Sequence, residues 1–258
     1  MLCFSRMMPR FFIDAPLALP AGTLFEVPPA VAQHIQVLRL RPGDSVTLFD
    51  GRGGETPAHI HDLGKRSASV ILGAHVAREA ELPYRITLIQ GIAGGDKMDW
   101  LLEKAVELGI ADCQPLQTER SVVRLHGERA MRREAHWLAL ARAACEQCGR
   151  NRVPDIYPIR SWRDWTATQS NTPATAPTLL LSPRGAAPLG VWARDQQTEI
   201  RAHGVRLLIG PEGGLSPDEE QQAIALGAIP LTLGPRVLRT ETAGLAALAA
   251  LHATLGEF

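Results

Sequence analysis

The sequence has no excess of charge of either sign, since its 258 residues include 27 lysines and arginines against 27 aspartates and glutamates. A balanced charge argues against a uniformly basic nucleic-acid-binding protein, although it leaves room for a local basic patch. Such a patch occurs between Arg120 and Arg152, where eight arginines stand against three acidic residues. We interpret this stretch either as a face that contacts RNA or as an ordinary solvated helix face.

Cysteine is scarce as well, because four cysteines in a chain of this length are too few for a disulfide framework. Cys145 and Cys148 form a CxxC pair, but a structural zinc site needs four ligands and no second CxxC or HxxxH motif lies nearby. The pair also falls inside a helical pattern. We therefore expect neither a metal site nor redox chemistry.

Long apolar runs are absent too. No segment reaches the roughly 18 apolar residues of a membrane span. The opening stretch MLCFSRMMPRFF lacks the apolar centre and the small-residue cleavage site of a signal peptide. We expect a cytoplasmic protein whose residues 1–7 form an extension with no structural role.

Short strands separated by turn residues are the pattern of the first part of the chain. The alternation and the β-branched residues in SVTLF, and the turn residues PGD that precede it, are typical of β-structure. The expected strands are 10–13, 23–27, 45–49, 56–61 and 67–75, with one short helix at 29–38. Strands at this spacing favour a small β-barrel. We predict a barrel domain over residues 8–76 and a linker over 77–83.

Strands alternate with helices from residue 84 onward, which predicts a parallel sheet covered on both faces. The expected strands are 84–90, 111–116, 179–181, 205–209 and 229–233. The expected helices are 97–108, capped by Asp96, then 128–148, a helix that starts at Ser216 and ends at Gly227, and 241–255. We therefore predict a second, α/β domain over residues 84–258. The uncharged stretch 166–178 is expected to be a flexible surface loop.

The glycine-rich segment GPEGG, residues 210–214, joins an expected strand to an expected helix. In open α/β sheets ligands bind beyond the carboxyl ends of strands, and glycine lets the backbone approach a ligand closely. The spacing is neither the GxGxxG of dinucleotide-binding folds nor the GxxxxGK[ST] of phosphate-binding loops. The segment predicts a ligand-binding loop of unspecified chemistry, or else a plain glycine turn.

A second strand-to-helix segment, LGPRVLRTETA, covers residues 233–243. Its guanidinium groups, Arg236 and Arg239, suit a phosphate or a carboxylate. Thr240 is expected to cap a helix that begins at Glu241. The alternative is that Arg239 and Glu241 form an ordinary surface pair.

A third segment, EQCGRNRVP, ends the expected helix 128–148. Its arginines, Arg150 and Arg152, are favoured by the dipole of a helix C-terminus. They are equally suited to contact RNA phosphates.

Taken in order, ACEQCGRNRVP, LLIGPEGGLS and LGPRVLRTETA resemble the RsmE family of 16S ribosomal RNA uridine-N3 methyltransferases. The segments GGDKMDWLLEKAVELGI, TERSVV and PRFFID resemble it as well, so the similarity extends from about Pro9 to the end and is weakest around 166–178. The resemblance implies a PUA-like N-terminal β-barrel that binds RNA and a SPOUT α/β methyltransferase domain with a trefoil knot. It further implies S-adenosylmethionine as cofactor, 16S rRNA in the small ribosomal subunit as substrate, and a homodimer.

The resemblance places the cofactor between three loops. The predicted cofactor-binding residues are Leu181, Ser182, Ile209, Gly210, Pro211, Glu212, Gly213, Gly214, Leu233, Gly234, Arg236, Val237, Leu238, Thr240 and Thr242. The predicted RNA-binding residues are Arg10, Arg120, Arg124, Arg150 and Arg152.

The reaction needs a group that removes the uridine imide proton or stabilises the anion that remains. Arg239 is the first candidate for stabilising the anion or a phosphate. Glu212 and Glu241 are the candidate bases, and Glu212 is better suited to pinning its own glycine loop. The sequence does not rank the two as bases, and it gives no target nucleotide.

Two other classes of protein stay open. A non-catalytic RNA-binding or ribosome-assembly protein would use the barrel and the arginine patch, and would not bind S-adenosylmethionine. An enzyme acting on a small nucleotide would use GPEGG as a phosphate loop, and would bind ATP or NAD. Among methyltransferases, the alternative is a different RNA position or base.

Overall fold

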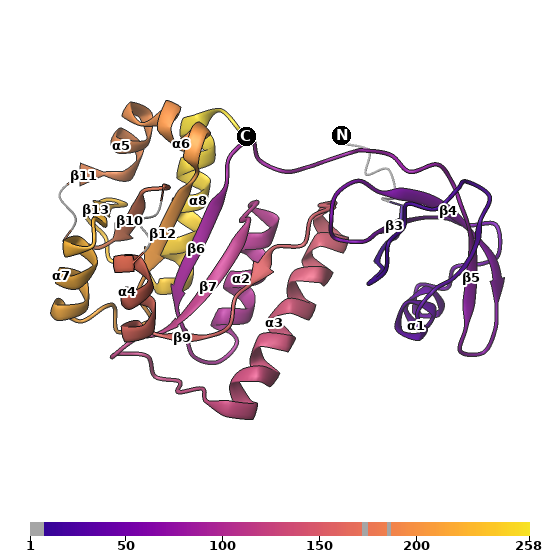
Figure 1. Cartoon of the computed structure of the whole chain (residues 1–258), viewed down its shortest axis with the longest axis horizontal. Coiled ribbons are helices and arrows are strands. Elements are labelled where there is room, and N and C mark those ends of the chain that lie inside the picture. Colours follow the sequence, from indigo (N-terminus) through magenta and orange to yellow (C-terminus); the bar gives the residue numbers. More distant parts are fainter. Residues whose placement is uncertain (1–7, 172–174, 185–186) are drawn as a thin grey trace. The chain divides into compact units, whose positions relative to one another are not determined.

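The computed structural model describes residues 8–171, 175–184 and 187–258, so the expectation about residues 1–7 lies outside the described part (Figure 1). The chain divides into two compact units. The N-terminal unit consists of Met1–Glu81 together with Arg142–Val153, and the C-terminal unit consists of Leu82–Ala141 and Pro154–Phe258. No described helix is long and apolar enough to cross a membrane.

The N-terminal unit is built on a five-stranded sheet with the order β1-β3-β4-β5-β2. β1 runs parallel to β3, and the other neighbours are antiparallel. The strands are β1 (Arg10–Phe12), β2 (Leu24–Glu26), β3 (Ser45–Phe49), β4 (Thr56–Leu63) and β5 (Ala68–Leu72), with one helix, α1 (Pro29–Val37). Each expected element of this region is present, although several are shorter or longer than expected by a few residues.

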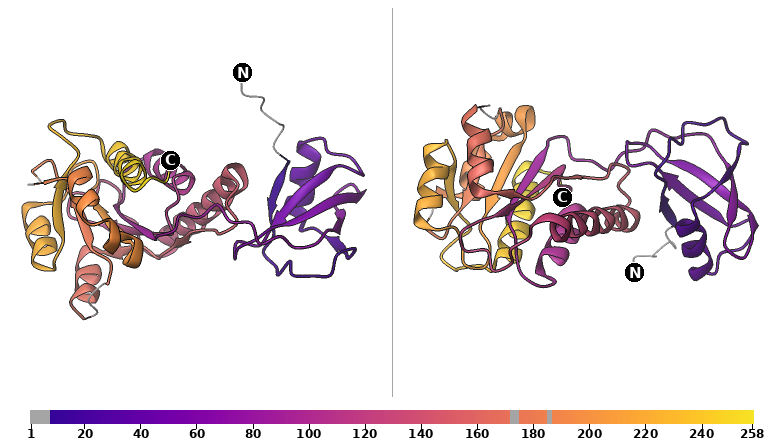
Figure 2. Two further views of the ribbon diagram at one scale, coloured as in Figure 1. Left: turned by 90° about the horizontal axis from the view of Figure 1, so that it is seen from above. Right: turned by 60° about the horizontal axis from the view of Figure 1, so that its bottom comes forward.

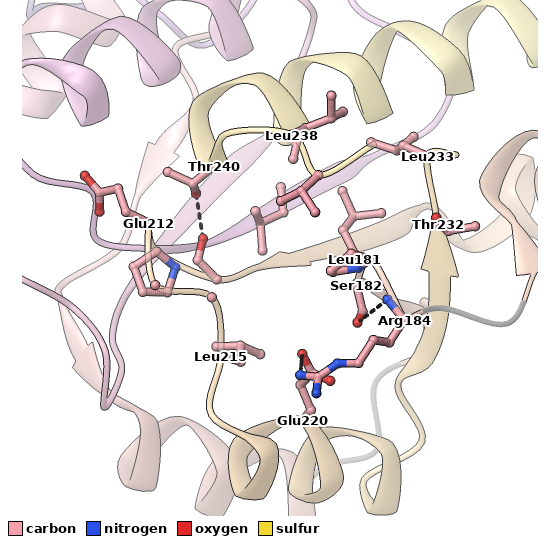
Figure 3. Close-up of a pocket in the computed structure, with 18 of the residues that line it drawn as sticks. Leu181, Ser182, Arg184, Glu212, Leu215, Glu220, Thr232, Leu233, Leu238 and Thr240 are labelled. Atoms are coloured by element: carbon pink, nitrogen blue, oxygen red, sulfur yellow. Dashed lines mark hydrogen bonds and ion pairs between the residues drawn. The ribbon is translucent and has the colours of Figure 1, made fainter. Parts of the chain in front are cut away.

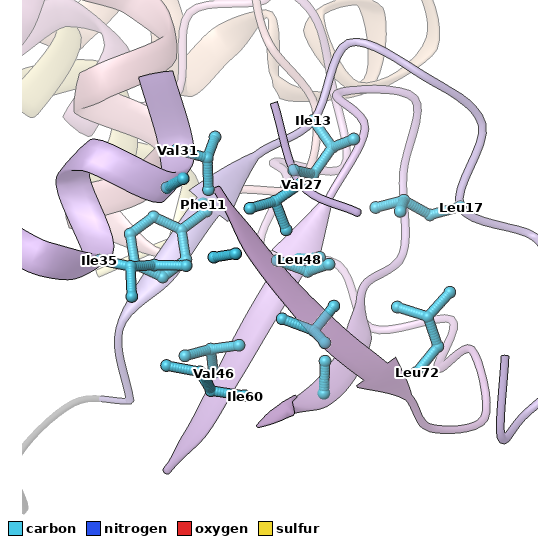
Figure 4. Packing of buried hydrophobic residues seen from close by; sticks show 14 residues of the cluster. Phe11, Ile13, Leu17, Val27, Val31, Ile35, Val46, Leu48, Ile60 and Leu72 are labelled. Carbon is cyan, nitrogen blue, oxygen red and sulfur yellow. The ribbon is translucent and has the colours of Figure 1, made fainter. Parts of the chain in front are cut away.

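One face of this sheet forms the core of the N-terminal unit (Figure 4). Side chains alternate between the two faces along β4, so that Ala58 and Ile60 are buried while their neighbours are exposed. Phe11 and Leu48 meet them from neighbouring strands, and Ile35 of α1 packs against the same cluster. The alternating pattern of the sequence thus becomes one buried face.

A segment from much later in the chain completes this unit. It contains the last turns of α3 (Gly127–Cys148) and the GRNR stretch that follows. Glu146 accepts a hydrogen bond from the Phe12 amide at 2.8 Å, and Asn151 donates one to the Arg78 carbonyl at 2.6 Å. The polar groups at this contact therefore have hydrogen-bond partners, and the segment is a structural part of the N-terminal unit.

The C-terminal unit contains an eight-stranded, entirely parallel sheet, which confirms the expected α/β architecture. Its strand order is β11-β13-β10-β12-β6-β7-β8, and β9 also pairs with β7. The strands are β6 (Ile86–Gly91), β7 (Asp112–Gln117), β8 (Asp155–Ile156), β9 (Arg160–Ser161), β10 (Thr178–Leu181), β11 (Ala187–Pro188), β12 (Val205–Ile209) and β13 (Ile229–Thr232).

Helices cover both faces of this sheet. α8 (Thr240–Leu255) packs beside α2 (Lys97–Glu107) and α5 (Leu189–Asp195), as Figure 2 shows for the first pair. α4 (Trp162–Asn171) and α7 (Pro217–Ala225) bury the opposite face, where Ile89 and Leu208 join the tryptophans of α4. A short helix, α6 (Gln197–His203), precedes β12.

Two local expectations are wrong. Residues 166–171 belong to α4 and are not a flexible loop, because Trp162 and Trp165 anchor this helix with ring centroids 5.2 Å apart. Residues 172–174 of the expected loop lie outside the described part. Asp96 does occupy the position before α2, but its side chain makes no capping hydrogen bond.

Candidate functional site

A pocket of about 250 Å³ lies beyond the carboxyl ends of β10, β12 and β13, where an open α/β sheet binds its ligands (Figure 3). Three loops supply most of its wall. The lining residues are 181–184, 209–215, 231–234 and 236–238, together with Arg120, Glu220, Thr240 and Ala243. The two strand-to-helix segments singled out in the sequence are thus brought to one cavity.

Backbone packing explains the glycines of this region. A Cβ on Gly210 would lie 2.6 Å from the Leu215 amide nitrogen, and one on Gly91 would lie 2.5 Å from the nitrogen of Pro211. Gly214 has a φ of +69°, which other residues rarely adopt. The backbone of the loop after β12 is therefore in direct contact with other backbone at Gly210 and Gly91, and neither position has room for a side chain.

Two hydrogen bonds, from Gln90 to Thr240 and from Thr240 to Gly210, join the pocket loops to β6. The Gln90 amide donates to the Thr240 hydroxyl at 2.9 Å, and this hydroxyl donates to the Gly210 carbonyl at 2.6 Å. The expectation that Thr240 caps α8 is therefore wrong. The helix begins at Thr240, Arg239 takes the position before it, and no side chain caps it.

Glu212 carries a carboxylate that fastens the glycine loop to the start of α2. Its Oε1 accepts hydrogen bonds from the Gly94 amide at 2.9 Å and from Lys97 Nζ at 3.1 Å. Partial burial raises the pKa of Glu212. The hydrogen bonds from the amides of Gly94 and of Glu212 itself, and the Lys97 ammonium, lower this pKa by a larger amount, so the net pKa is below its usual value. A carboxylate held in this way is a weak proton acceptor.

Charged groups at the rim of the pocket hold its loops in place. Arg120 donates to the carbonyls of Gly213 and Leu215 at 3.1 and 3.4 Å. Arg184 forms an ion pair with Glu220 at 3.3 Å. Sequence reasoning missed both partners of this pair as site residues, because they are 36 positions apart and nothing in the sequence indicates that they meet.

The helix that follows the glycine loop starts with a capping box. Ser216 accepts from the Glu219 amide at 3.3 Å, and Glu219 accepts from the Ser216 amide at 2.9 Å. The other oxygen of Glu219 accepts from the Glu119 amide at 2.8 Å. One carboxylate thus fixes the start of α7 and the chain after β7 together.

The structure places fourteen of the fifteen predicted cofactor residues at the pocket, and Thr242 is the exception. Neither Arg239 nor Glu241 belongs to the lining. Arg239 is exposed to solvent. Glu241 Oε2 is buried and has no hydrogen-bond partner among the described residues. Leu215, Leu231, Thr232 and Ala243 also line the pocket, and their adjacency to the predicted segments is the signal that would have found them.

The predicted RNA-binding arginines differ in how they are engaged. The Arg10 side chain is 8% exposed, pairs with Glu55 at 2.7 Å and lies over the Phe49 ring. The Arg150 side chain is 4% exposed and holds both oxygens of Glu81. Both arginines therefore stabilise the N-terminal unit, and their geometry does not support RNA contact.

The remaining predicted arginines are closer to solvent. Arg152 is about half exposed and pairs with Glu79 at 3.1 Å. Arg124 is exposed and donates to the Glu119 carbonyl at 2.7 Å. Arg120, which is exposed as well, and these two side chains are accessible to a nucleic acid.

Among the described residues, Cys113 and Cys145 are buried and Cys148 is partly buried. Burial raises the pKa of the Cys145 thiol to about 12, and its Sγ lies 3.5 Å from the Arg152 carbonyl. A thiol with so high a pKa is unreactive. Within the part of the chain that the structure describes, no group of three histidine, cysteine or acidic side chains could hold a metal ion.

Two domain families match the chain. The RNA methyltransferase domain matches residues 80–252, and the RNA methyltransferase PUA domain matches residues 27–73. The ribosomal RNA small subunit methyltransferase E of Buchnera aphidicola subsp. Schizaphis graminum is 30% identical over 254 residues, covering 98% of this chain and 99% of that protein. The protein of that name from Bacillus subtilis is 27% identical, with coverages of 95% and 96%.

Solved structures show the same similarity. The ribosomal RNA small subunit methyltransferase E from Neisseria gonorrhoeae bound to S-adenosyl methionine superimposes with a TM-score of 0.85 at 39% identity, covering 95% of this chain and 97% of that chain. A methyltransferase from Legionella pneumophila with bound cofactor SAM gives 0.83 at 33% identity, with the same coverages. The similarity therefore includes both units of the chain.

Proposed function

The chain belongs to the family of ribosomal RNA small subunit methyltransferase E, and on this premise we propose that it methylates N3 of one uridine in 16S ribosomal RNA. It is an S-adenosylmethionine-dependent rRNA methyltransferase. The observation that carries the proposal is the single pocket to which the family segments GPEGG and LGPRVLRT converge.

The pocket residues fit S-adenosylmethionine. Leu181, Leu233 and Leu238 give apolar wall for a flat base, and the glycine loop offers backbone groups that no side chain shields. When bound, this cofactor supplies a methyl group on a positively charged sulfur. Gln90 and Thr240 hold the loops around it in fixed positions, which favours alignment of the two reacting atoms.

The side chains near the pocket divide into positioning and chemical roles. Glu212 is engaged by three donors and is assigned to positioning the loop. Arg239 is exposed, between the lining residues Leu238 and Thr240, and is assigned to stabilising the uridine anion or a neighbouring phosphate. Glu241, whose Oε2 has no partner among the described residues, stays the candidate base.

Further parts of the proposal concern the whole enzyme. We assign RNA binding to the PUA-like domain, residues 8–76, with help from Arg120, Arg124 and Arg152, and methyl transfer to residues 84–258. A SPOUT-type trefoil knot is part of the proposal, and the bond between Thr240 and Gly210, which holds the first residue of α8 against the loop after β12, is compatible with it. A homodimer acting in the cytoplasm, where ribosomes are assembled, completes the proposal.

The test is methyl transfer from labelled S-adenosylmethionine to small ribosomal subunits that lack the modification, followed by mass spectrometry of the RNA. We expect one N3-methyluridine. Arg239→Ala should bind cofactor normally and lose turnover, while Arg194→Ala, an exposed change on α5, should leave both unchanged. Cofactor binding without transfer to any uridine would contradict the proposed substrate, and full turnover of Arg239→Ala would contradict the role of Arg239.

A further inference from the structure

A second hollow, of about 330 Å³, lies in the C-terminal unit near the amino ends of β6, β7 and β12. None of its lining residues belongs to the pocket described above. Its polar wall includes Arg85, Asp112, Tyr157, Arg160 and Arg206. Three guanidinium groups against one carboxylate give the hollow a net positive charge.

The strand register shows that this hollow departs from the usual pattern of a parallel sheet. Arg206 pairs with Thr87, and Thr87 pairs with Asp112, so their side chains form one row on one face. Faces of parallel sheets are normally covered and apolar. The next row holds Leu208 and Ile89, which pack under α4 as expected. A polar row at this place therefore has a cost in desolvation that calls for a partner.

Arg206 shows this need most clearly. Its guanidinium lies over the ring of Trp165, 5.9 Å from the centroid, and burial lowers the pKa of Arg206. Among the described residues it makes no hydrogen bond and no ion pair. Asp112 is the carboxylate whose charge acts on Arg206, but it is already paired with Arg85 at 2.8 Å. A partly desolvated cation without a bound acceptor is a ready site for an anion.

The neighbouring side chains extend this site. Arg160 donates only to the Thr168 hydroxyl, at 3.3 Å, which leaves other N–H groups available. Tyr157 also lines the hollow, and its hydroxyl is a possible further donor. We propose that the hollow binds a phosphate group, held by Arg206 and Arg160. Phosphate fits better than a carboxylate, because its tetrahedral oxygens can accept from more than one guanidinium fork.

The test measures binding of inorganic phosphate to the full-length protein by calorimetry. Arg206→Gln should weaken binding by about tenfold or more, because it removes a charge-assisted bond. Arg194→Gln, an equal change of charge on α5, should leave binding unchanged. Equal phosphate affinity in Arg206→Gln and the wild type would overturn the proposal.

Asp112→Asn provides a test that misfolding cannot imitate. It removes the negative charge from the wall while keeping an acceptor for Arg85, so phosphate should bind several-fold more tightly. No gain in affinity, in a variant that keeps the wild-type melting temperature, would contradict the site.

The phosphate can come from a free anion or from the RNA backbone. If RNA is the source, Arg206→Gln should weaken binding of a substrate oligonucleotide and reduce its salt dependence by about one counterion. If the source is a small anion, RNA binding should stay unchanged while phosphate binding is lost. Both results support the site, and methyl transfer plays no part in either measurement.

Discussion

At the scale of single residues, the pocket depends on two buried polar side chains, Gln90, which does not line it, and Thr240, which does. Gln90 is fully buried in β6, and its amide reaches the Thr240 hydroxyl and the Gly91 carbonyl. Each bond satisfies a group that would otherwise be buried alone. The position of the glycine loop is thus fixed by residues that lie outside the segment GPEGG.

Thr240→Val removes the hydroxyl and keeps the shape of the side chain. It removes the 2.6 Å bond to the Gly210 carbonyl and leaves only the longer one, 3.4 Å, from the Gln90 amide, so we expect a stability loss of about 1 kcal/mol. The dissociation constant for S-adenosylmethionine should rise by about tenfold. Thr242→Val, an exposed change on the same helix, is the control. Equal affinities of the two variants, measured by calorimetry, would refute this role of Thr240.

A carboxylate in the N-terminal unit predicts sensitivity to acid. Hydrogen bonding from Arg78, and less from Arg10, outweighs burial and lowers the pKa of Glu55 to about 2 from its ordinary 4.5. A lowered folded-state pKa stabilises the protein above pH 4.5, and this contribution is lost as the pH falls toward 2.

The variant Glu55→Gln tests this effect. At neutral pH it should lower the free energy of unfolding by on the order of 2 kcal/mol. The difference from the wild type should shrink as urea denaturation is repeated at lower pH. A difference that stays constant between pH 7 and pH 3 would show that the ion pairs of Glu55 contribute no pH dependence.

At the scale of elements, the capping box of α7 links helix stability to the pocket loop. Ser216→Ala removes the side-chain acceptor and should lower stability by about 1 kcal/mol. Gln221→Ala, an exposed change inside the same helix, should have little effect. Thermal denaturation followed by circular dichroism compares the two, and equal melting temperatures would contradict the role of the cap.

The sequence predicts those elements that carry a local signal. Strands 45–49 and 205–209 have the expected bounds, because alternating or continuous apolar residues and turn residues mark them. The helix α4 was missed, since its Ser- and Thr-rich composition does not reveal that Trp162 and Trp165 pack against the sheet. Long-range partners override weak local preferences there.

The site follows the same division. The role of the loop glycines can be predicted from the sequence, because a close approach of two backbone segments leaves room for no other residue type. The roles of Arg10 and Arg150 were not, because their partners, Glu55 and Glu81, are 45 and 69 positions away. A buried ion pair and an RNA contact call for the same residue type, and only the fold separates them.

At the scale of the whole molecule, the two units should respond differently to the cofactor. Binding at a hundredfold excess over the dissociation constant stabilises the site by about 2.7 kcal/mol. Hydrogen exchange measured by mass spectrometry should therefore slow in the loops after β10, β12 and β13. Amides of β3, β4 and β5 serve as the internal reference, and we expect their exchange to stay the same. Equal protection of both regions would show that the units behave as one cooperative body.

The late segment of the N-terminal unit has a consequence for synthesis. Residues 142–153 supply Glu146 and Asn151 to partners near Phe12 and Arg78, and the chain in between builds β6, α2 and β7 of the other unit. At translation rates of about 5–20 residues per second, those partners wait several seconds. The part of the protein that is made first is therefore not finished first. A nascent chain stalled before residue 142 should have all five strands of this sheet but lack the segment that packs against them, and so be open to chaperones and proteases whatever the stability of the mature enzyme.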